Sequence, residues 1–185
     1  MREIEVLVKC DNSKEEIIEK VKNFKFINEK RVIDTYYYDE LRDVLKPDNN
    51  LRLNECFRIR DKNGETYLTY KIDKFDGDIW LYSDEFETKV DDKEQLENII
   101  NKLGLKELIK IDNTKITYET DEYYIFVEDV KKLGIFLEVE LKVDRDDDVE
   151  MLKNEIREFI DSLNLKNVIE SNEGKPEMML KAINK

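Results

Sequence analysis

The stretch Glu3-Ile4-Glu5-Val6-Leu7-Val8-Lys9-Cys10 decides the fold, because its side chains alternate between two chemical types. Successive side chains of a β-strand point to opposite faces. One face of this stretch is apolar and consists of Ile4, Val6, Val8 and Cys10. The other carries Glu3, Glu5, Leu7 and Lys9, and it is ionic apart from the leucine. The stretch therefore predicts a strand with a hydrophobic core on one side and charge on the other.

The same division recurs far along the chain, in residues 136–143. An apolar row of Leu137, Val139, Leu141 and Val143 alternates with Phe136, Glu138, Glu140 and Lys142. Shorter examples are Phe57-Arg58-Ile59-Arg60 and residues 68–72, where Lys71 lies opposite the apolar row. Residues 79–90, 109–118 and 123–130 also alternate. Residues 61–64 end in Asn-Gly, which predicts a hairpin turn. Most of the chain is therefore expected to be antiparallel sheet.

Helical patterns interrupt the strands in three places. Ser13 and Glu16 form a capping-box signature before an apolar stripe that ends near Phe24. Residues 96–103 repeat the helical spacing and are followed by Gly104, residues 149–163 form the third amphipathic stretch, and a short tail helix follows Pro176. Residues 44–50 are expected to form a loop. The pattern predicts an α+β fold, in which helices flank a closed or nearly closed antiparallel eight-stranded β-barrel with a tunnel inside.

Composition excludes several classes of protein. The chain has 185 residues, 32 Lys and Arg against 45 Asp and Glu, a net charge of −13 and no histidine. Its length fits one domain over residues 1–185. The acidity argues against nucleic acid as a partner, and the lack of a long apolar run argues against a membrane span and favours a cytoplasmic protein. Without histidine or a C-x-x-C pair, a metal would be held by carboxylates, which favours Mg²⁺ or Mn²⁺.

The ionic rows have two interpretations. They are either solvated outer faces or the lining of a wet, ion-balanced interior. Carboxylates two residues apart recur at positions 3 and 5, 85 and 87, and 138 and 140, and Arg58 and Arg60 form a basic pair. Paired glutamates on neighbouring strands repel unless a divalent cation lies between them, and arginines aimed at the same space suit a polyphosphate. If the rows face inward, they describe a triphosphate site.

These residues occur in an order that resembles the CYTH superfamily of triphosphate tunnel metalloenzymes, which includes CyaB-type class IV adenylate cyclases and thiamine and inorganic triphosphatases. The resemblance extends from Glu3 to about Leu180. It comprises an E-x-E opening, a D-x-Y-Y-like segment, an LRIR-like segment, T-x-K, a second E-x-E, an R-x-x-Y counterpart and a late E-x-E. In this chain these segments are Glu3-Ile4-Glu5, residues 34–39, Phe57–Arg60, Thr69–Lys71, Glu85–Glu87, Lys115–Tyr118 and residues 128–140.

The resemblance implies roles for individual side chains. Carboxylates near a Mg²⁺ or Mn²⁺ ion would be Glu3, Glu5, Glu128, Glu138 and Glu140. Cations on phosphate oxygens would be Arg58, Arg60, Lys71 and Lys115, and catalysis would centre on Glu138, Glu140 and Lys71. Glu85 and Glu87 would hold neighbouring cations near the substrate or lie on the outer face. Lys9 is a further candidate for substrate binding, although Lys9 and Lys142 also suit structural counter-ions.

The chain departs from the family pattern mainly in its cations. Leu7 replaces a lysine, Ser83 replaces an arginine, and Asn113 and Lys115 replace lysine and arginine. Glu128 replaces aspartate, and a tyrosine-bearing terminal motif is replaced by residues 175–180. Lysine does not reproduce the bidentate contacts of arginine. The carboxylates are therefore better preserved than the cations.

The resemblance leaves the reaction open. A cyclase would convert ATP to cyclic AMP and pyrophosphate, whereas a phosphohydrolase would act on ATP, thiamine triphosphate or tripolyphosphate; overall resemblance leans slightly to the cyclase. The alternatives are a non-catalytic nucleotide or polyphosphate binder with a degenerate tunnel and, less compatible with the ionic rows, a lipocalin-like carrier. Tyr36, Tyr37 and Trp80 suit either base stacking or core packing. The sequence leaves the oligomeric state open, a homodimer included.

Overall fold

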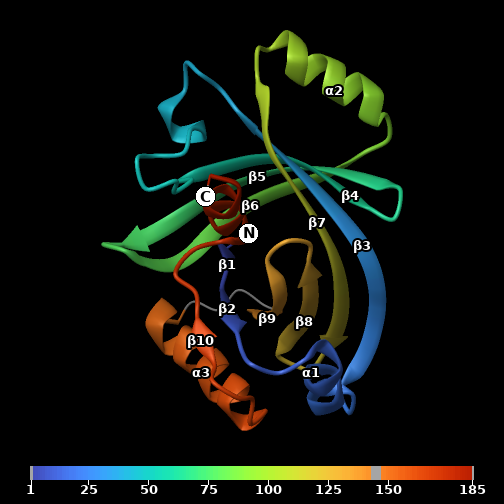
Figure 1. Cartoon of the computed structure of the whole chain (residues 1–185), viewed down its shortest axis with the longest axis vertical. Coiled ribbons are helices and arrows are strands. Elements are labelled where there is room, and N and C mark those ends of the chain that lie inside the picture. Colours follow the sequence, from blue (N-terminus) through green and yellow to red (C-terminus); the bar gives the residue numbers. More distant parts are fainter. Residues whose placement is uncertain (1, 143–146, 185) are drawn as a thin grey trace.

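A curled antiparallel sheet dominates the computed structural model, which describes residues 2–142 and 147–184 (Figure 1). Within these residues the sheet has the strand order β1-β6-β5-β4-β3-β7-β8-β9-β2-β10. The central strands are β3 (Lys25–Tyr38), β4 (Glu55–Lys62), β5 (Glu65–Asp76), β6 (Ile79–Val90), β7 (Lys106–Glu119), β8 (Tyr123–Val130) and β9 (Gly134–Leu141). The expected α+β class with an antiparallel sheet and flanking helices is confirmed.

The N-terminal stretch joins the two ends of this sheet. It forms two short strands, β1 (Arg2–Glu3) and β2 (Glu5–Lys9), on either side of Ile4. β1 pairs with β6, whereas β2 pairs with β9 and with β10 (Ile169–Glu170). The prediction of one unbroken strand was wrong, because the chain changes its pairing partner at Ile4. The described residues form ten strands instead of the expected eight. The N-terminal stretch forms two strands, β1 and β2, in place of one, and β10 is an additional strand.

The sequence patterns did not predict β3. This strand pairs along much of its length with both β4 and β7. A bulge between Phe26 and Asn28 shifts its register, so that the alternation of side chains is interrupted near its start. Its inward side also mixes charged and apolar residues, including Asp34 and Tyr36. Both features hide the period of two that reveals the other strands. The hairpin after β4 is as predicted, with positive φ at Asn63 and Gly64.

Helices form at the predicted places, and their ends follow local rules. α1 (Lys14–Val21) begins at Ser13, whose hydroxyl accepts from the Glu16 amide while the Glu16 carboxylate accepts from the Ser13 amide. The others are α2 (Lys93–Lys102), α3 (Val149–Ser162) and α4 (Lys175–Ile183). The predicted loop at 44–50 overlaps a 3₁₀ turn at Asp43–Leu45. None of the described helices has the length and apolar character needed to cross a bilayer.

The apolar rows of the strands are covered by helices. α1 and α3 lie together at one end of the molecule, and α2 lies at the other (Figure 1). The largest core places Ile4, Val6, Val8, Leu137, Val139 and Leu141 against Ile17 and Val21 of α1 and Leu152, Ile156 and Ile160 of α3. The predicted apolar rows are thus confirmed, except for Val143, which lies outside the described residues. Because this face of the sheet is buried, the charged rows point to the opposite, concave face.

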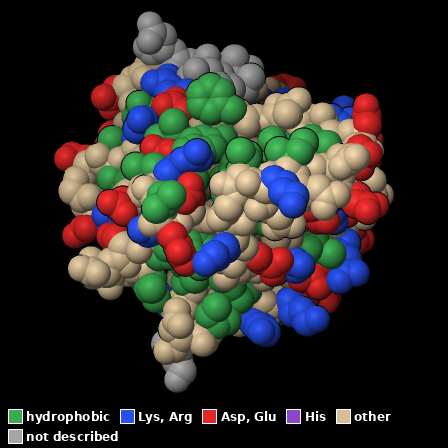
Figure 2. Space-filling view, turned by 90° about the horizontal axis from the view of Figure 1, so that it is seen from above, with side chains coloured by type: hydrophobic (Ala, Val, Ile, Leu, Met, Phe, Trp, Pro, Cys, Tyr) green, Lys and Arg blue, Asp and Glu red, His purple; other side chains and the backbone are tan. Residues whose placement is uncertain are grey.

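The outer surface is mixed in charge. Figure 2 looks onto the end that carries α2 and shows acidic and basic side chains interspersed around a band of hydrophobic ones. Ile99 of α2 and Leu103 directly after it are exposed, as is Leu41 in the segment after β3. Some strand residues, such as Lys25, Lys89 and Lys110, are also exposed, so the inward ionic rows are only part of the charge that the sheet carries.

Replacement of Ile156 by alanine tests whether α3 covers the core as described. Ile156 is fully buried, so we expect Ile156→Ala to lower the free energy of unfolding by about 2–5 kcal/mol. Met151→Ala on the same helix is the control, because Met151 is exposed and its loss should cost less than about 0.5 kcal/mol. Urea unfolding measures both, and equal losses would contradict this packing.

Candidate active site

A cavity of about 430 Å³ lies inside the curl of the sheet. Among the described residues, side chains of nine strands, β1 to β9, line it together with the first turn of α4. Ten carboxylates and seven cations among the described residues face it. The carboxylates are Glu3, Glu5, Asp34, Asp73, Glu85, Glu87, Glu128, Glu138, Glu140 and Glu177, and the cations are Lys30, Arg58, Arg60, Lys62, Lys71, Lys115 and Lys175. The ionic rows therefore face inward, with acid in excess.

Three of these carboxylates form a cluster with the chemistry of a metal site. Oxygens of Glu5, Glu138 and Glu140 all lie within 4.8 Å of one another. Glu5 of β2 lies opposite Glu140 of β9, and Glu138 is two residues further along the same face of β9. An all-oxygen, carboxylate donor set fits a hard divalent ion such as Mg²⁺ or Mn²⁺. Glu3 and Glu128, the other two carboxylates expected near a metal, are not part of this cluster. Glu3 contacts Lys71, and Glu128 contacts Lys115.

Crowding of negative charge changes the acidity of this cluster. Burial, together with Glu3, Glu5 and Glu138 nearby, raises the pKa of Glu140 to about 9. Burial also raises the pKa of Glu5 to about 7, against the opposing effect of Lys71. Burial acts in the same direction on Glu138, but Lys115 and Lys175 outweigh it and hold the pKa of that carboxyl well below its usual range. Glu140 is thus the carboxylate that most lacks a positive partner.

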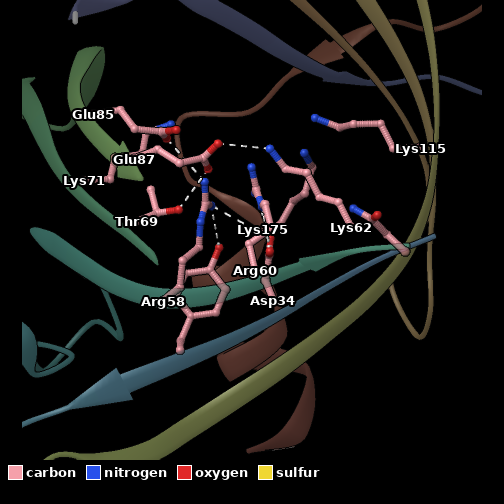
Figure 3. A network of polar contacts seen from close by, with 12 residues as sticks. Asp34, Arg58, Arg60, Lys62, Thr69, Lys71, Glu85, Glu87, Lys115 and Lys175 are labelled. Carbon is pink, nitrogen blue, oxygen red and sulfur yellow. Dashed lines mark hydrogen bonds and ion pairs between the residues drawn. The ribbon is translucent and has the colours of Figure 1, made fainter. Parts of the chain in front are cut away.

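Two arginines of β4 form the basic wall of the cavity. Arg60 donates two hydrogen bonds to Asp34, at 2.7 and 2.8 Å. Arg58 donates to the Tyr36 hydroxyl at 3.1 Å and to Glu85 at 3.2 Å. Figure 3 shows both guanidinium groups with Lys62, Lys71, Lys115 and Lys175 around a common space. The Arg58 Nε is buried and has no hydrogen-bond partner among the described residues. This donor is available to an anion.

Three lysines connect the basic wall to the acidic cluster. Lys71 Nζ lies 2.9 Å from Glu3 and 3.0 Å from Glu5. Lys115 Nζ lies 2.8 Å from Glu128 and 3.1 Å from Glu138. Lys175 Nζ reaches the same two carboxylates, at 2.9 and 2.5 Å. Glu5 and Glu138 are therefore ion-paired with lysines of the cavity.

The remaining predicted residues divide into two groups. Glu85 and Glu87 face the cavity, where Glu87 contacts Lys62 at 3.0 Å and accepts from the Thr69 hydroxyl. Lys9 does not face it; its Nζ donates to the Leu133 carbonyl at 3.0 Å and lines a second cavity of about 730 Å³. Lys142 pairs with Glu119 at 3.0 Å, as expected of a counter-ion.

Lys175 is one of the charged cavity residues that the sequence patterns missed; the others are Lys30, Asp34, Lys62, Asp73 and Glu177. It enters the cavity from α4, and Figure 1 shows this helix across the middle of the sheet. Met179 and Leu180 of α4 share an apolar cluster with Leu7. Leu7, which stands where the family pattern has a lysine, thus packs in the core that holds α4. The first turn of α4 brings the Lys175 ammonium into the cavity. The only local signal was Gly174 before Lys175-Pro176, which marks the start of a helix.

Two further departures are accommodated locally. Asn113 donates a 2.8 Å hydrogen bond to the fully buried Glu128. Ser83 donates to Asp73 at 2.6 Å and accepts from the Trp80 indole at 3.2 Å. Asn113 therefore supplies one of the hydrogen bonds that the buried Glu128 carboxylate needs. Ser83 places an uncharged hydroxyl, hydrogen-bonded to Asp73 and Trp80, where the family pattern has an arginine.

This chain belongs to the CYTH domain family, whose signature matches residues 1–170. A relative from Methanocaldococcus jannaschii named "Putative adenylate cyclase" is 34% identical over 167 residues, which cover 89% of this chain and 91% of the relative. A solved protein of Pyrococcus horikoshii OT3 has a TM-score of 0.80 at 28% identity, with 97% of this chain and 98% of that one covered. A Hippeastrum protein named "Putative adenylyl cyclase" and described as having a dominant triphosphatase activity shares the fold, with a TM-score of 0.66 at 13% identity and 100% of this chain and 96% of that one covered.

Replacing Glu140 by glutamine should stabilise the metal-free protein. A carboxyl whose pKa is raised in the fold binds a proton that the unfolded chain releases above pH 4.5, so its contribution to stability falls as the pH rises toward 9. Glutamine removes this loss. We expect Glu140→Gln to raise the free energy of unfolding by about 1–3 kcal/mol at pH 8, and by less at pH 5, in the presence of a chelator.

Glu138→Gln is the matched control, because it should have the opposite sign. Glu138 is ion-paired with Lys115 and Lys175, and its loss leaves two buried ammonium groups with one fewer partner. We expect a loss of about 1–3 kcal/mol at pH 8 without loss of the fold. Urea titration at both pH values measures the pair. Destabilisation by Glu140→Gln would contradict the assignment of uncompensated charge to that carboxylate.

Proposed function

We propose that this protein is a divalent-metal-dependent enzyme that acts on a triphosphate substrate. The observation that carries the proposal is the placement of a carboxylate cluster and a wall of cations in one enclosed cavity. The carboxylates suit a hard metal ion, and the arginines and lysines suit phosphate oxygens. Membership of the CYTH family supports the same reading of the cavity.

Glu5, Glu138 and Glu140 would hold a Mg²⁺ or Mn²⁺ ion. Such an ion would supply positive charge that stabilises the negative charge of the phosphates. The ten carboxylates outnumber the seven cations that face the cavity, so the site has negative charge for an ion to compensate. The raised pKa values of Glu5 and Glu140 mean that these carboxyls would release protons on binding the ion.

The cations would bind and orient the triphosphate. Arg58 and Arg60 present N–H groups from one wall of the cavity. The Arg58 Nε has no hydrogen-bond partner among the described residues, so it can donate to an anion. Lys71, Lys115 and Lys175 contact carboxylates of the cavity, and their ammonium groups would bind phosphate oxygens of the substrate. In phosphoryl transfer most of the catalysis comes from such positioning and charge neutralisation.

Two reactions fit this arrangement. In the cyclase reaction the ribose 3′-oxygen forms a bond to the α-phosphorus of ATP and loses its proton, the bond to the β-phosphate oxygen breaks, and pyrophosphate leaves. In hydrolysis, a water oxygen forms a bond to the terminal phosphorus and loses a proton to the solvent, the bond from that phosphorus to the bridging oxygen breaks, and the shortened phosphate chain leaves. The name of the Methanocaldococcus jannaschii relative favours the class IV cyclase reaction, which we adopt as the first candidate. Triphosphate hydrolysis is the second, because the same cradle serves both.

A non-catalytic binder is the remaining alternative, suggested by the cations missing at Leu7 and Ser83. Lys175 argues against it, because this side chain restores a cation beside Glu128 and Glu138. The cavity then holds seven basic groups despite the two departures. The set of cations is thus larger than the sequence motifs indicate.

Incubation with Mn²⁺ and either ATP or tripolyphosphate tests the proposal. We expect turnover, read separately as cyclic AMP and as inorganic phosphate, and a loss of at least 100-fold in kcat for Glu138→Gln. Arg58→Ala should chiefly weaken substrate binding and lower kcat/KM by about 10–100-fold. Glu65→Gln is the control, because this exposed side chain pairs with Lys89 at 2.6 Å, away from the cavity. Neither product at micromolar enzyme would favour the binder.

Lys175→Ala tests the contribution of α4. The variant removes a cation from the cavity, so we expect a 10–100-fold lower kcat/KM for tripolyphosphate. Lys181→Ala on the same helix is the control, since its ammonium pairs with Glu173 at the surface, and it should stay within about twofold of wild type. Equal rates for the two variants would show that Lys175 only neutralises the carboxylates.

A further inference from the structure

One side of β6 is paired over only a small part of its length. On its other side, β6 pairs with β5 from Ile79 to Val90. On this side, β1 pairs with Ser83 and Asp84 alone. Among the described residues, the stretch Phe86-Glu87-Thr88-Lys89-Val90, called the β6 edge below, therefore has no strand beside it on this side. An unpaired edge presents N–H and C=O groups on which a further strand can form.

The β6 edge is open to solvent. Phe86 is 60% exposed, and Glu87, Thr88 and Lys89 are exposed as well. The Glu87 side chain is only 25% exposed, because it turns into the curl of the sheet and contacts Lys62 (Figure 3). Much of the exposed surface of Glu87 is therefore backbone. The edge is thus accessible to the backbone of another strand.

Other incompletely paired parts of the sheet are protected against such pairing. The beginning of β3, before its pairing with β4 starts at Val32, is interrupted by the bulge between Phe26 and Asn28. β10, at the end of the strand order, is only two residues long. Bulges and very short strands both hinder pairing at an edge. The β6 edge has neither protection, since its register with β5 is regular from Tyr82 to Val90.

The outer face of the β6 edge continues an aromatic row. Tyr37, Phe57, Tyr70 and Phe86 lie opposite one another on β3, β4, β5 and β6. The ring centroids of Tyr37 and Phe57 are 6.2 Å apart, and those of Phe57 and Tyr70 are 6.1 Å apart. The row is buried at Tyr37 and ends in the exposed ring of Phe86. An apolar side chain on a further strand, opposite Phe86, would cover this ring.

The β6 edge is complementary to itself when two copies run antiparallel. Residues directly opposite each other in such a pair lie on the same face and interact. With Thr88 on the two-fold axis, Phe86 lies opposite Val90 of the other copy, and Glu87 lies opposite its Lys89. Each of these pairs occurs twice. The outer face then gains apolar pairs, the inner face gains pairs of opposite charge, and the two threonines meet at the axis.

Neighbouring registers lack this complementarity. An axis at Glu87 would bring the two Glu87 carboxylates together. An axis at Lys89 would bring two ammonium groups together and place Glu87 opposite Asp91. An axis between two residues would place an outward side chain opposite an inward one. The pattern of charges and apolar residues therefore selects the register with Thr88 at the axis.

We propose that this protein forms a homodimer in which the two β6 edges pair antiparallel around a two-fold axis at Thr88. The interface is isologous and joins the two curled sheets into one. It is small, so the dimer forms reversibly with a micromolar dissociation constant. Lys89 of the second copy lies beside Glu87, a carboxylate that lines the first cavity. The inference goes beyond the proposed function and does not depend on it.

Sedimentation of the full chain at about 1–200 µM tests for the dimer. We expect wild type to shift reversibly from monomer to dimer over this range. Thr88→Lys brings two ammonium groups together at the axis, so we expect it to weaken the dimer by at least about 10-fold. Thr88 is exposed, so this change leaves the core intact.

A pair of charge reversals tests the register. Lys89→Glu places carboxylates opposite each other across the axis, and Glu87→Lys does the same with ammonium groups. Each variant alone should weaken the dimer by about 10–100-fold. In an equimolar mixture, the carboxylates of one variant lie opposite the ammonium groups of the other. We therefore expect the mixture to form a heterodimer with nearly the wild-type affinity.

Lys110→Glu is the matched control for Lys89→Glu. Both lysine side chains are 53% exposed and contact a nearby glutamate, but Lys110 lies on β7, away from the β6 edge. The control should leave the dissociation constant within about twofold of wild type. Cooperative thermal unfolding checks that each variant is folded. Should Glu87→Lys fail this check because Lys62 loses its partner, Thr88→Lys and Lys89→Glu still test the edge.

Three results would each overturn the inference. The first is a wild type that stays monomeric up to about 200 µM. The second is a dimer that neither Thr88→Lys nor Lys89→Glu weakens, which would place the interface elsewhere. The third is a mixture of the two folded charge-reversal variants without heterodimer. Because none of these measurements depends on turnover, an inactive protein would overturn the proposed function and leave the dimer standing.

Discussion

Ion pairing across the inside of the sheet is the interaction on which the rest of the structure depends. A buried ion without a partner costs several kcal/mol, so strands with charged inner rows curl around one another only where opposite charges meet. Arg60 with Asp34, Lys71 with Glu3 and Glu5, and Lys115 with Glu128 provide these meetings. The pairing is incomplete at Glu140, where burial and the nearby carboxylates of Glu3, Glu5 and Glu138 raise the pKa of the carboxyl. Under the proposed function, a metal ion would add positive charge at this point of the cavity.

Much of the fold and part of the candidate site could be predicted from side-chain alternation. The rows of β2 and β9 followed from a period of two, and the buried apolar row fixed which way Glu5 and Glu138 point. β3 escaped because its bulge breaks the alternation. Lys175 escaped because no local pattern shows that the end of the chain returns to the middle of the sheet. Lys9 lies on the same row of β2 as Glu5 and Leu7. It is not part of the first cavity, because this end of the row lines the second cavity instead.

The departures from the family pattern are connected through packing. A lysine at position 7 would bring a cation directly from β2, but Leu7 joins the apolar cluster that contains Met179 and Leu180. That cluster holds α4 in place, and α4 positions Lys175 against Glu128 and Glu138. The cation is thus supplied from a helix instead of a strand. In a comparison of sequence motifs, Leu7 is the loss of a cation. In the three-dimensional arrangement, Lys175 keeps a positive charge at the cavity.

The most direct test of the central claim is the position of Mn²⁺ in crystals grown with a non-hydrolysable triphosphate analogue, located by its anomalous scattering. The account predicts an anomalous peak between the carboxylates of Glu5, Glu138 and Glu140, at about 2.1–2.3 Å from their oxygens, with the phosphates on the side of Arg58 and Arg60. A fully occupied manganese site elsewhere, with Lys71, Lys115 and Lys175 still paired to their carboxylates, would contradict it.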